Sequence, residues 1–117
     1  MAKNHNKDSL SDNLSQELRR GMLVLAVLTQ LEEAQYGYSL KQRLAEKGMD
    51  IKEGTLYPLL RRLESQGVLE SSWEIIDNAR PRRYYKISKL GKQIQQSLKA
   101  DWLNMIGVMD NLFADAK

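Results

Sequence analysis

The spacing of apolar residues changes twice along the chain, from helical to alternating and back to helical. Between Ser15 and Glu33 they recur every three or four positions, so we expect a helix there. Residues 1–14 are polar and lack this period, and we expect them to form a flexible arm. The expected inward stripe of the helix is Leu18, Met22, Leu25, Leu28 and Leu31, widened by Val24 and Val27.

Two shorter helical patterns follow a turn over residues 34–37. The first runs from Ser39 to Lys47 and ends at Gly48, with Leu40 and Leu44 facing inward. The second covers residues 54–66 and ends at Gly67, where a left-handed cap is expected. Its inward residues are Leu56, Leu59, Leu60 and Leu63.

The start of this second pattern is open between two alternatives. Asp50 followed by Glu53 resembles a capping box, whereas a cap at Thr55 would bring Pro58 close to the first turn. We therefore expect either a late start of the helix or a kink at Pro58.

After Gly67, β-branched and aromatic residues alternate with polar ones, as in strands. Residues 68–76 and 82–87 are the two expected strands, and residues 77–81 form the turn between them. Ser88 then caps a last helix expected from Lys89 to about Ala114. That helix is roughly 39 Å long at 1.5 Å per residue, which is more than a small domain can cover. Its apolar stripe therefore predicts an intermolecular partner.

Composition limits the classes of function. The chain has 117 residues with 42% hydrophobic and 28% charged, as in one globular domain. It has no cysteine, and its single histidine, His5, lies in the polar N-terminal stretch, so we expect no metal site and no cofactor. It lacks a glycine-rich phosphate loop and paired catalytic groups, so we do not expect an enzyme. No run of apolar residues is long enough to span a membrane, and no signal peptide is visible, so we expect a cytoplasmic protein.

The basic charge is concentrated in the middle of the chain. Residues 52–92 contain nine Lys or Arg and five Asp or Glu, whereas the whole chain has a net charge of only +3. On the polar face of the helix over residues 54–66 lie Thr55, Tyr57, Arg61 and Arg62, which can donate to phosphates and base edges. The basic hairpin after it could be a protected sheet edge, but we favour a wing that contacts phosphates. These patterns predict a mostly α fold with a small β-hairpin, namely a winged helix-turn-helix followed by a long C-terminal helix.

Four blocks of the sequence are informative in combination, namely Gly21–Leu28, Tyr36–Leu40, Glu53–Gly67 and Arg82–Gly91. Together they resemble the PadR family of transcriptional regulators. The resemblance extends from residue 18 to about residue 112, and the chain ending is similar to the short subgroup with one C-terminal helix.

The resemblance implies a dimer, usually a repressor, that binds a palindromic operator in double-stranded DNA. In this family the dimer forms through the C-terminal helix with help from the first helix, and some members are released by small aromatic or lipophilic effectors. With the patterns above, the resemblance implies three parts of the chain. They are a flexible arm over residues 1–14, a DNA-binding domain over residues 15–88 and a dimerisation helix over residues 89–117.

Site residues follow from the motifs and from the C-terminal stripe. The residues expected at DNA are Tyr38, Ser39, Thr55, Tyr57, Arg61, Arg62, Arg80, Arg82 and Arg83. The expected dimer interface is Leu90, Ile94, Leu98, Trp102, Met105, Met109 and Leu112. An effector could lie against Trp102, Met105, Ile106 and Met109, although packing in the interface is the simpler explanation for these residues. The alternative function is a winged-helix protein-interaction module that binds no specific DNA, for which the concentrated positive charge has no use.

Overall fold

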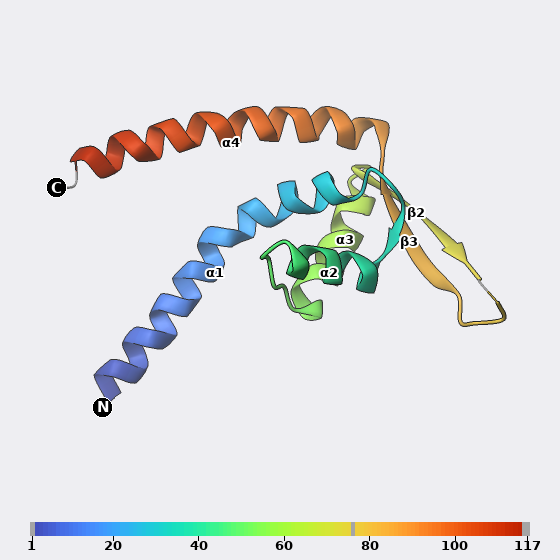
Figure 1. Cartoon of the computed structure of the whole chain (residues 1–117), viewed down its shortest axis with the longest axis horizontal. Coiled ribbons are helices and arrows are strands. Elements are labelled where there is room, and N and C mark those ends of the chain that lie inside the picture. Colours follow the sequence, from blue (N-terminus) through green and yellow to red (C-terminus); the bar gives the residue numbers. More distant parts are fainter. Residues whose placement is uncertain (1, 76, 116–117) are drawn as a thin grey trace.

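The computed structural model describes residues 2–75 and 77–115, and in them Figure 1 shows helices gathered beside a small sheet. Expectations that fall on Met1, Ile76, Ala116 and Lys117 lie outside the described residues. The elements in chain order are α1 (Ala2–Gln30), β1 (Gln35–Tyr36), α2 (Gly37–Glu46), α3 (Glu53–Ser65), β2 (Leu69–Glu74), β3 (Arg82–Ile87) and α4 (Lys89–Asp115). This is the expected winged helix-turn-helix with a long C-terminal helix.

Both glycines expected to end helices have left-handed backbone conformations. Gly48 has φ +104° and Gly67 has φ +80°. Beyond each glycine the backbone turns back onto the helix, so that Met49 N–H donates to the Leu44 carbonyl at 2.8 Å and Val68 N–H to the Leu63 carbonyl at 2.9 Å. These bonds satisfy carbonyls that the helix end would leave free, so the sequence prediction is confirmed.

The N-cap of α3 is neither of the two residues considered above. The helix begins at Glu53 with Lys52 as its N-cap, and no side chain caps it. Thr55 N–H and Leu56 N–H both donate to the Lys52 carbonyl at 3.0 Å, so the first turn is already closed at Thr55. The late start was therefore wrong, and Pro58 lies inside the helix.

α1 also differs from its expected extent, because it begins at Ala2 and ends at Gln30. Its N-terminal half projects away from the winged domain in Figure 1, and only its C-terminal part packs against the other helices. For this reason Leu18, expected to face inward, is 74% exposed. Met22 and Leu25 are only half-buried. The buried residues of α1 are Leu23, Val27 and Leu28, and Leu31 directly after the helix is also buried.

The core lies between this part of α1, α2, α3 and the inner face of the sheet. Leu56, Leu60 and Leu63 are buried as expected, while Leu59 is half-buried. The sheet has the strand order β1–β3–β2, and both pairings are antiparallel. The first strand replaces part of the turn expected over residues 34–37, because Gln35 and Tyr36 pair with Tyr85 and Tyr84.

Hydrogen bonds join the start of α4 to the residues that follow α3. Ser88 Oγ accepts a hydrogen bond from Gly91 N–H at 2.9 Å, which confirms the predicted cap. Ser88 Oγ also lies 2.6 Å from the Gly67 carbonyl, to which it donates. Gly91 is needed here, because a Cβ atom would lie only 2.2 Å from the Val68 carbonyl oxygen. From this anchor α4 leaves the domain, and all residues from 99 to 115 are exposed.

Candidate nucleic-acid interface

One face of α3 is entirely open to solvent. Its members recur at the same helical spacing as the buried leucines but on the other side of the helix. This exposed stripe consists of Gly54, Pro58, Arg61, Arg62 and Ser65.

The exposed stripe is suited to a groove in DNA. A Cβ atom at Gly54 would meet nothing within 4 Å, so the first turn of α3 is a small, unobstructed surface. The two arginines in its second half can donate to guanine edges or phosphates, and the small residues before them let the helix approach closely. Sequence reasoning found Arg61 and Arg62 but missed Gly54 and Pro58, although their phase opposite to the leucines could have indicated them.

Tyr57 is half-buried and does not belong to this stripe. Its ring covers Gly37 at the start of α2, where a Cβ atom would lie 2.8 Å from Tyr57 Cε1. Burial raises the pKa of the Tyr57 hydroxyl above 10, and the charge of Glu53 raises it further, so the phenol is neutral at physiological pH. Tyr57 therefore holds α2 against α3, and only its neutral hydroxyl can act as a donor.

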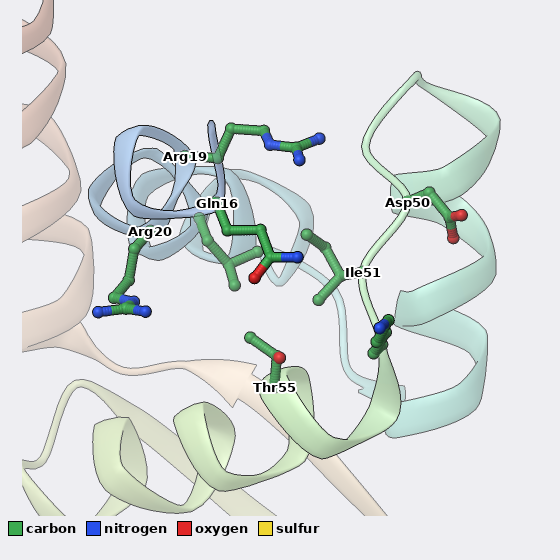
Figure 2. A pocket seen from close by; sticks show the side chains of 8 residues that line it. Gln16, Arg19, Arg20, Asp50, Ile51 and Thr55 are labelled. Carbon is green, nitrogen blue, oxygen red and sulfur yellow. The ribbon is translucent and has the colours of Figure 1, made fainter. Parts of the chain in front are cut away.

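At the start of α2, Tyr38 is exposed to solvent, whereas Ser39 is hydrogen-bonded within the chain. Tyr38 is 47% exposed, and its ring centroid lies 6.4 Å from that of Tyr36. Ser39 Oγ donates to Gln35 Oε1 at 3.1 Å, so its proton is used within the chain. Thr55 is exposed and lies on the side of α3 that faces α1 (Figure 2).

The hairpin of β2 and β3 forms the wing, and its arginines have different environments. Arg80 is exposed on the turn. Arg82 Cζ lies 4.6 Å from the centroid of the Tyr36 ring, a cation–π contact on the outer face of the sheet. Tyr84 borders Tyr36 on the same face, with ring centroids 5.8 Å apart. Sequence reasoning missed Tyr36, because the strand that brings it there has only two residues.

Arg83 points to the other face and is engaged with α3. Arg83 Nη2 lies 2.5 Å from Glu64 Oε1, and Arg83 Nε donates to Ser71 Oγ at 3.2 Å. The Ser71 hydroxyl in turn donates to Glu64 Oε2, which closes a triangle between α3, β2 and β3. The hydrogen bond from Arg83 is the main reason why the pKa of Glu64 is lowered below its ordinary value, and that from Ser71 adds to it. The expected phosphate contact of Arg83 thus competes with an internal ion pair.

Tyr85 on β3 is buried, and its burial is the main cause that raises its pKa above the ordinary value. The positive charge of Arg83 opposes this rise, the negative charge of Glu64 adds to it, and the positive charge of Arg61 opposes it. Arg61 itself is exposed on α3.

A metal site and a membrane-spanning helix were also sought in the part of the chain that the structure describes. Among the side chains that the structure describes, in residues 7–75 and 77–115, no group of three or more His, Asp or Glu is placed to hold a metal ion. Among the helices described, none has the length and apolar content needed to cross a membrane.

Comparisons with known proteins agree with this geometry. A crystal structure of a PadR family transcriptional regulator from Eggerthella lenta is similar over 93% of this chain and 96% of that chain, with 40% identity and a TM-score of 0.85. A PadR-like transcription factor from Bacteroides fragilis is 32% identical, with a TM-score of 0.73, over 86% of this chain and 98% of that chain. A transcriptional regulator of Mycobacterium tuberculosis is 35% identical over 77 residues, which are 65% of this chain and 71% of that protein. The model of the transcriptional regulator PadR-like family matches residues 24–97. The chain belongs to the PadR-like family of transcriptional regulators, which is not a class of enzymes.

Proposed function

We propose that this regulator binds a specific operator by placing α3 in the major groove and the wing on the phosphate backbone. The observation that carries the proposal is the exposed stripe of α3, in which Gly54 and Pro58 leave room for the groove and Arg61 and Arg62 supply donors. The exposed Arg80 and Arg82 of the wing continue the positive charge beside it.

The proposal includes a dimer and a two-fold symmetric operator. Met105, Met109 and Leu112 on α4 are exposed in the single chain, and they continue the stripe on which Ile94 and Leu98 are half-buried. An apolar stripe of this length is stable in water only when it is covered, and a second copy covers it with the least additional structure. A two-fold dimer presents two α3 helices, which accounts for a palindromic site. We further propose that binding represses transcription, which a reporter gene under the operator would test.

Selection of bound sequences from a random DNA pool tests the proposal and yields the operator. On that operator, an Arg61→Ala/Arg62→Ala variant should lose about 1–3 kcal/mol of binding free energy per base contact removed, which is about 5- to 150-fold in affinity. Lys99→Ala, an exposed residue on α4, is the matched control and should bind normally. Unchanged affinity of the folded double variant, or no enrichment from the pool, would contradict the proposal.

An effector on the stripe of α4 is a second element of the proposal. Trp102 is 42% exposed, and Met105, Ile106 and Met109 follow it at helical spacing with exposed, adaptable apolar side chains. In a dimer these residues would meet their symmetry mates, and a planar ligand between them would change the separation of the two α3 helices. Quenching of tryptophan fluorescence by planar aromatic compounds should persist in Trp73→Phe and vanish in Trp102→Phe. If no compound quenches the wild type, Trp102 only packs.

A further inference from the structure

Three tyrosine rings lie close together where the sheet meets the start of α2. Tyr36 is the central one, and the ring centroids of Tyr38 and Tyr84 lie 6.4 Å and 5.8 Å from its own. Arg82 of the wing lies against the same ring, with Cζ 4.6 Å from the centroid. Tyr36 thus lies between the first turn of α2, an element that crosses the DNA backbone in helix-turn-helix proteins, and the arginine that begins β3.

The position of Tyr36 is fixed from three directions. Its backbone pairs with Tyr84 of β3. The preceding Gln35 donates from Nε2 to the Gln30 carbonyl at 2.5 Å, and its Oε1 accepts from Ser39 Oγ at 3.1 Å. The two-residue strand β1 is therefore joined to the end of α1, to the first turn of α2 and to the wing. The half-buried Tyr36 ring is a rigid support for a neighbouring side chain.

Arg82 has two neighbours of opposite character on this face of the sheet. Its direct cross-strand partner is Glu74 on β2, and residues opposite one another share a face. Because β3 lies between β1 and β2, Tyr36 and Glu74 flank Arg82 on opposite sides. The guanidinium lies over the Tyr36 ring, and within residues 7–75 and 77–115 no carboxylate lies at ion-pair distance from it. Arg82 is therefore held at the ring and away from the carboxylate.

This arrangement favours binding to an anion such as phosphate. A cation–π contact orients the guanidinium without engaging its N–H donors with an acceptor oxygen, so these donors stay available. An arginine that is already held also loses less rotamer freedom when it binds. An ion pair with Glu74 would have the opposite effect, because a phosphate would have to displace the carboxylate.

We propose that Tyr36 is a positioning residue for DNA binding, whose ring holds the Arg82 guanidinium ready for a backbone phosphate. The ring acts through Arg82, and the Tyr36 hydroxyl is not required. Without the ring, Arg82 is free to move and to pair with Glu74. This inference rests on the proposed function, in which Arg82 contacts the DNA backbone.

The first test uses the full chain without DNA and needs no variant to fold. In nuclear magnetic resonance spectra of wild type, the Arg82 Nε–H group should be shifted upfield by the ring and should have a higher order parameter than that of Arg80, which is exposed on the turn. Tyr36→Phe should keep both features, because it keeps the ring. Tyr36→Leu should lose both. An Arg82 side chain as mobile as Arg80 in wild type would overturn the inference.

The second test is a double-mutant cycle on the selected operator. Tyr36→Leu should lower operator affinity about two- to tenfold per protomer, the range for losing an exposed cation–π contact and having one more side chain to order. In the Arg82→Ala background the same change should alter affinity less than about twofold, because the residue through which the ring acts is absent. Operator and unrelated DNA should weaken alike, because phosphates carry no base identity.

Two variants separate positioning from other roles of the ring. Tyr36→Phe should bind within about twofold of wild type, and a loss as large as that of Tyr36→Leu would assign the contact to the hydroxyl. Trp73→Leu is the matched control, because it removes an exposed ring 5.6 Å from Arg83 Cζ and leaves Arg82 unchanged. It should bind like wild type, and an equal loss in this variant would show a general effect of changing the wing.

Failure of this inference is distinct from failure of the proposed function. If wild type binds no specific DNA, both fail. If wild type binds its operator and Tyr36→Leu, folded by circular dichroism, binds it equally well, the proposed function stands and the positioning role of Tyr36 is wrong. Equal losses from Tyr36→Leu with and without Arg82 would also overturn the role, because the ring would then act independently of that arginine.

Discussion

Arg80, Arg82 and Arg83 lie within four residues of one another in the sequence, yet each has a different environment in the fold. Arg80 lies on the turn of the wing and is exposed. Successive residues of β3 point to opposite faces, so Arg82 stacks on Tyr36 on the outer face while Arg83 pairs with Glu64 on the inner one. The arginine that pairs with Glu64 of α3 is thus the direct neighbour in sequence of an arginine that is exposed on the outer face.

Replacement of Glu64 by Gln should lower the free energy of unfolding at neutral pH. The pKa of Glu64 is lowered in the folded state below its ordinary value of 4.5. Between these two pKa values the folded protein binds fewer protons than the unfolded chain. The stabilisation that the Glu64 carboxylate gives is therefore complete above pH 4.5 and disappears as the pH falls through the lower folded-state pKa. The difference between wild type and Glu64→Gln, measured by urea unfolding, should shrink on acidification.

Glu70→Gln is the control for this measurement. Glu70 is exposed on β2 and next in sequence to Ser71, and its replacement should change the free energy of unfolding little. If Glu64→Gln destabilises the protein equally at neutral and at acid pH, the carboxylate charge is not what stabilises the contact.

The limits of sequence reasoning at the residue scale follow from distance along the chain. Gly48 and Gly67 end their helices, and Ser88 caps α4, through bonds within a few residues, and these three roles were predicted. Glu64 and Arg83 are 19 residues apart, and their pairing depends on how the wing packs on α3. Exposure and charge alone could not distinguish Arg83 from Arg82.

At the scale of elements, α1 shows why an expected boundary can be wrong. Its N-terminal half contains many Asn, Asp and Ser residues, which weaken helix propensity and conceal the period of Leu10, Leu14 and Leu18. The helix nevertheless extends over 29 residues, and these three leucines lie along it exposed. The strand β1 escaped prediction for a different reason, because two residues are too few to show a period. The extents of α2, β2, β3 and α4 were predicted closely, because their apolar patterns are complete within each element.

The wing as an element should contribute to DNA affinity independently of sequence. Removing one phosphate contact reduces the steepness of log affinity against log salt by about 0.9, so Arg80→Ala/Arg82→Ala should reduce it by about two per protomer. Operator and unrelated DNA should weaken to a similar degree, because phosphates carry no base identity. Filter binding over a range of salt concentrations measures the affinity for each DNA and the slope of log affinity against log salt. Lys99→Ala, which removes a positive charge from α4 instead of the wing, is the control.

A selective loss of operator binding at constant slope would contradict this assignment. It would mean that the wing recognises bases and not the backbone. Arg83→Ala is unsuitable for the same test, because it would break the contact with Glu64 and displace the wing as a whole.

At the scale of the whole molecule, the chain consists of a winged domain and two long arms. The N-terminal half of α1 and the C-terminal half of α4 leave the domain in diverging directions (Figure 1). Both carry exposed apolar side chains, namely Leu10, Leu14 and Leu18 on α1 and Trp102, Met105, Ile106, Met109, Leu112 and Phe113 on α4. Two copies related by a two-fold axis could cover these surfaces with one another, which a single chain cannot do.

Replacement of Met105 by Glu should therefore convert the proposed dimer into a monomer. Burial of a large apolar side chain stabilises by about 1.5–3 kcal/mol, and a two-fold interface contains the residue twice, so the dissociation constant should rise by about two to four orders of magnitude. The neighbouring Asn104→Glu introduces the same charge at an exposed position off the stripe and should leave the dimer intact. Analytical ultracentrifugation at micromolar concentration measures the assembly, and circular dichroism checks that both variants keep their helices. The monomer should also lose specific operator affinity, because its two α3 helices no longer bind as one unit. A monomeric wild type, or a Met105→Glu variant that remains dimeric, would show that the exposed stripe of α4 is covered by something other than a second copy.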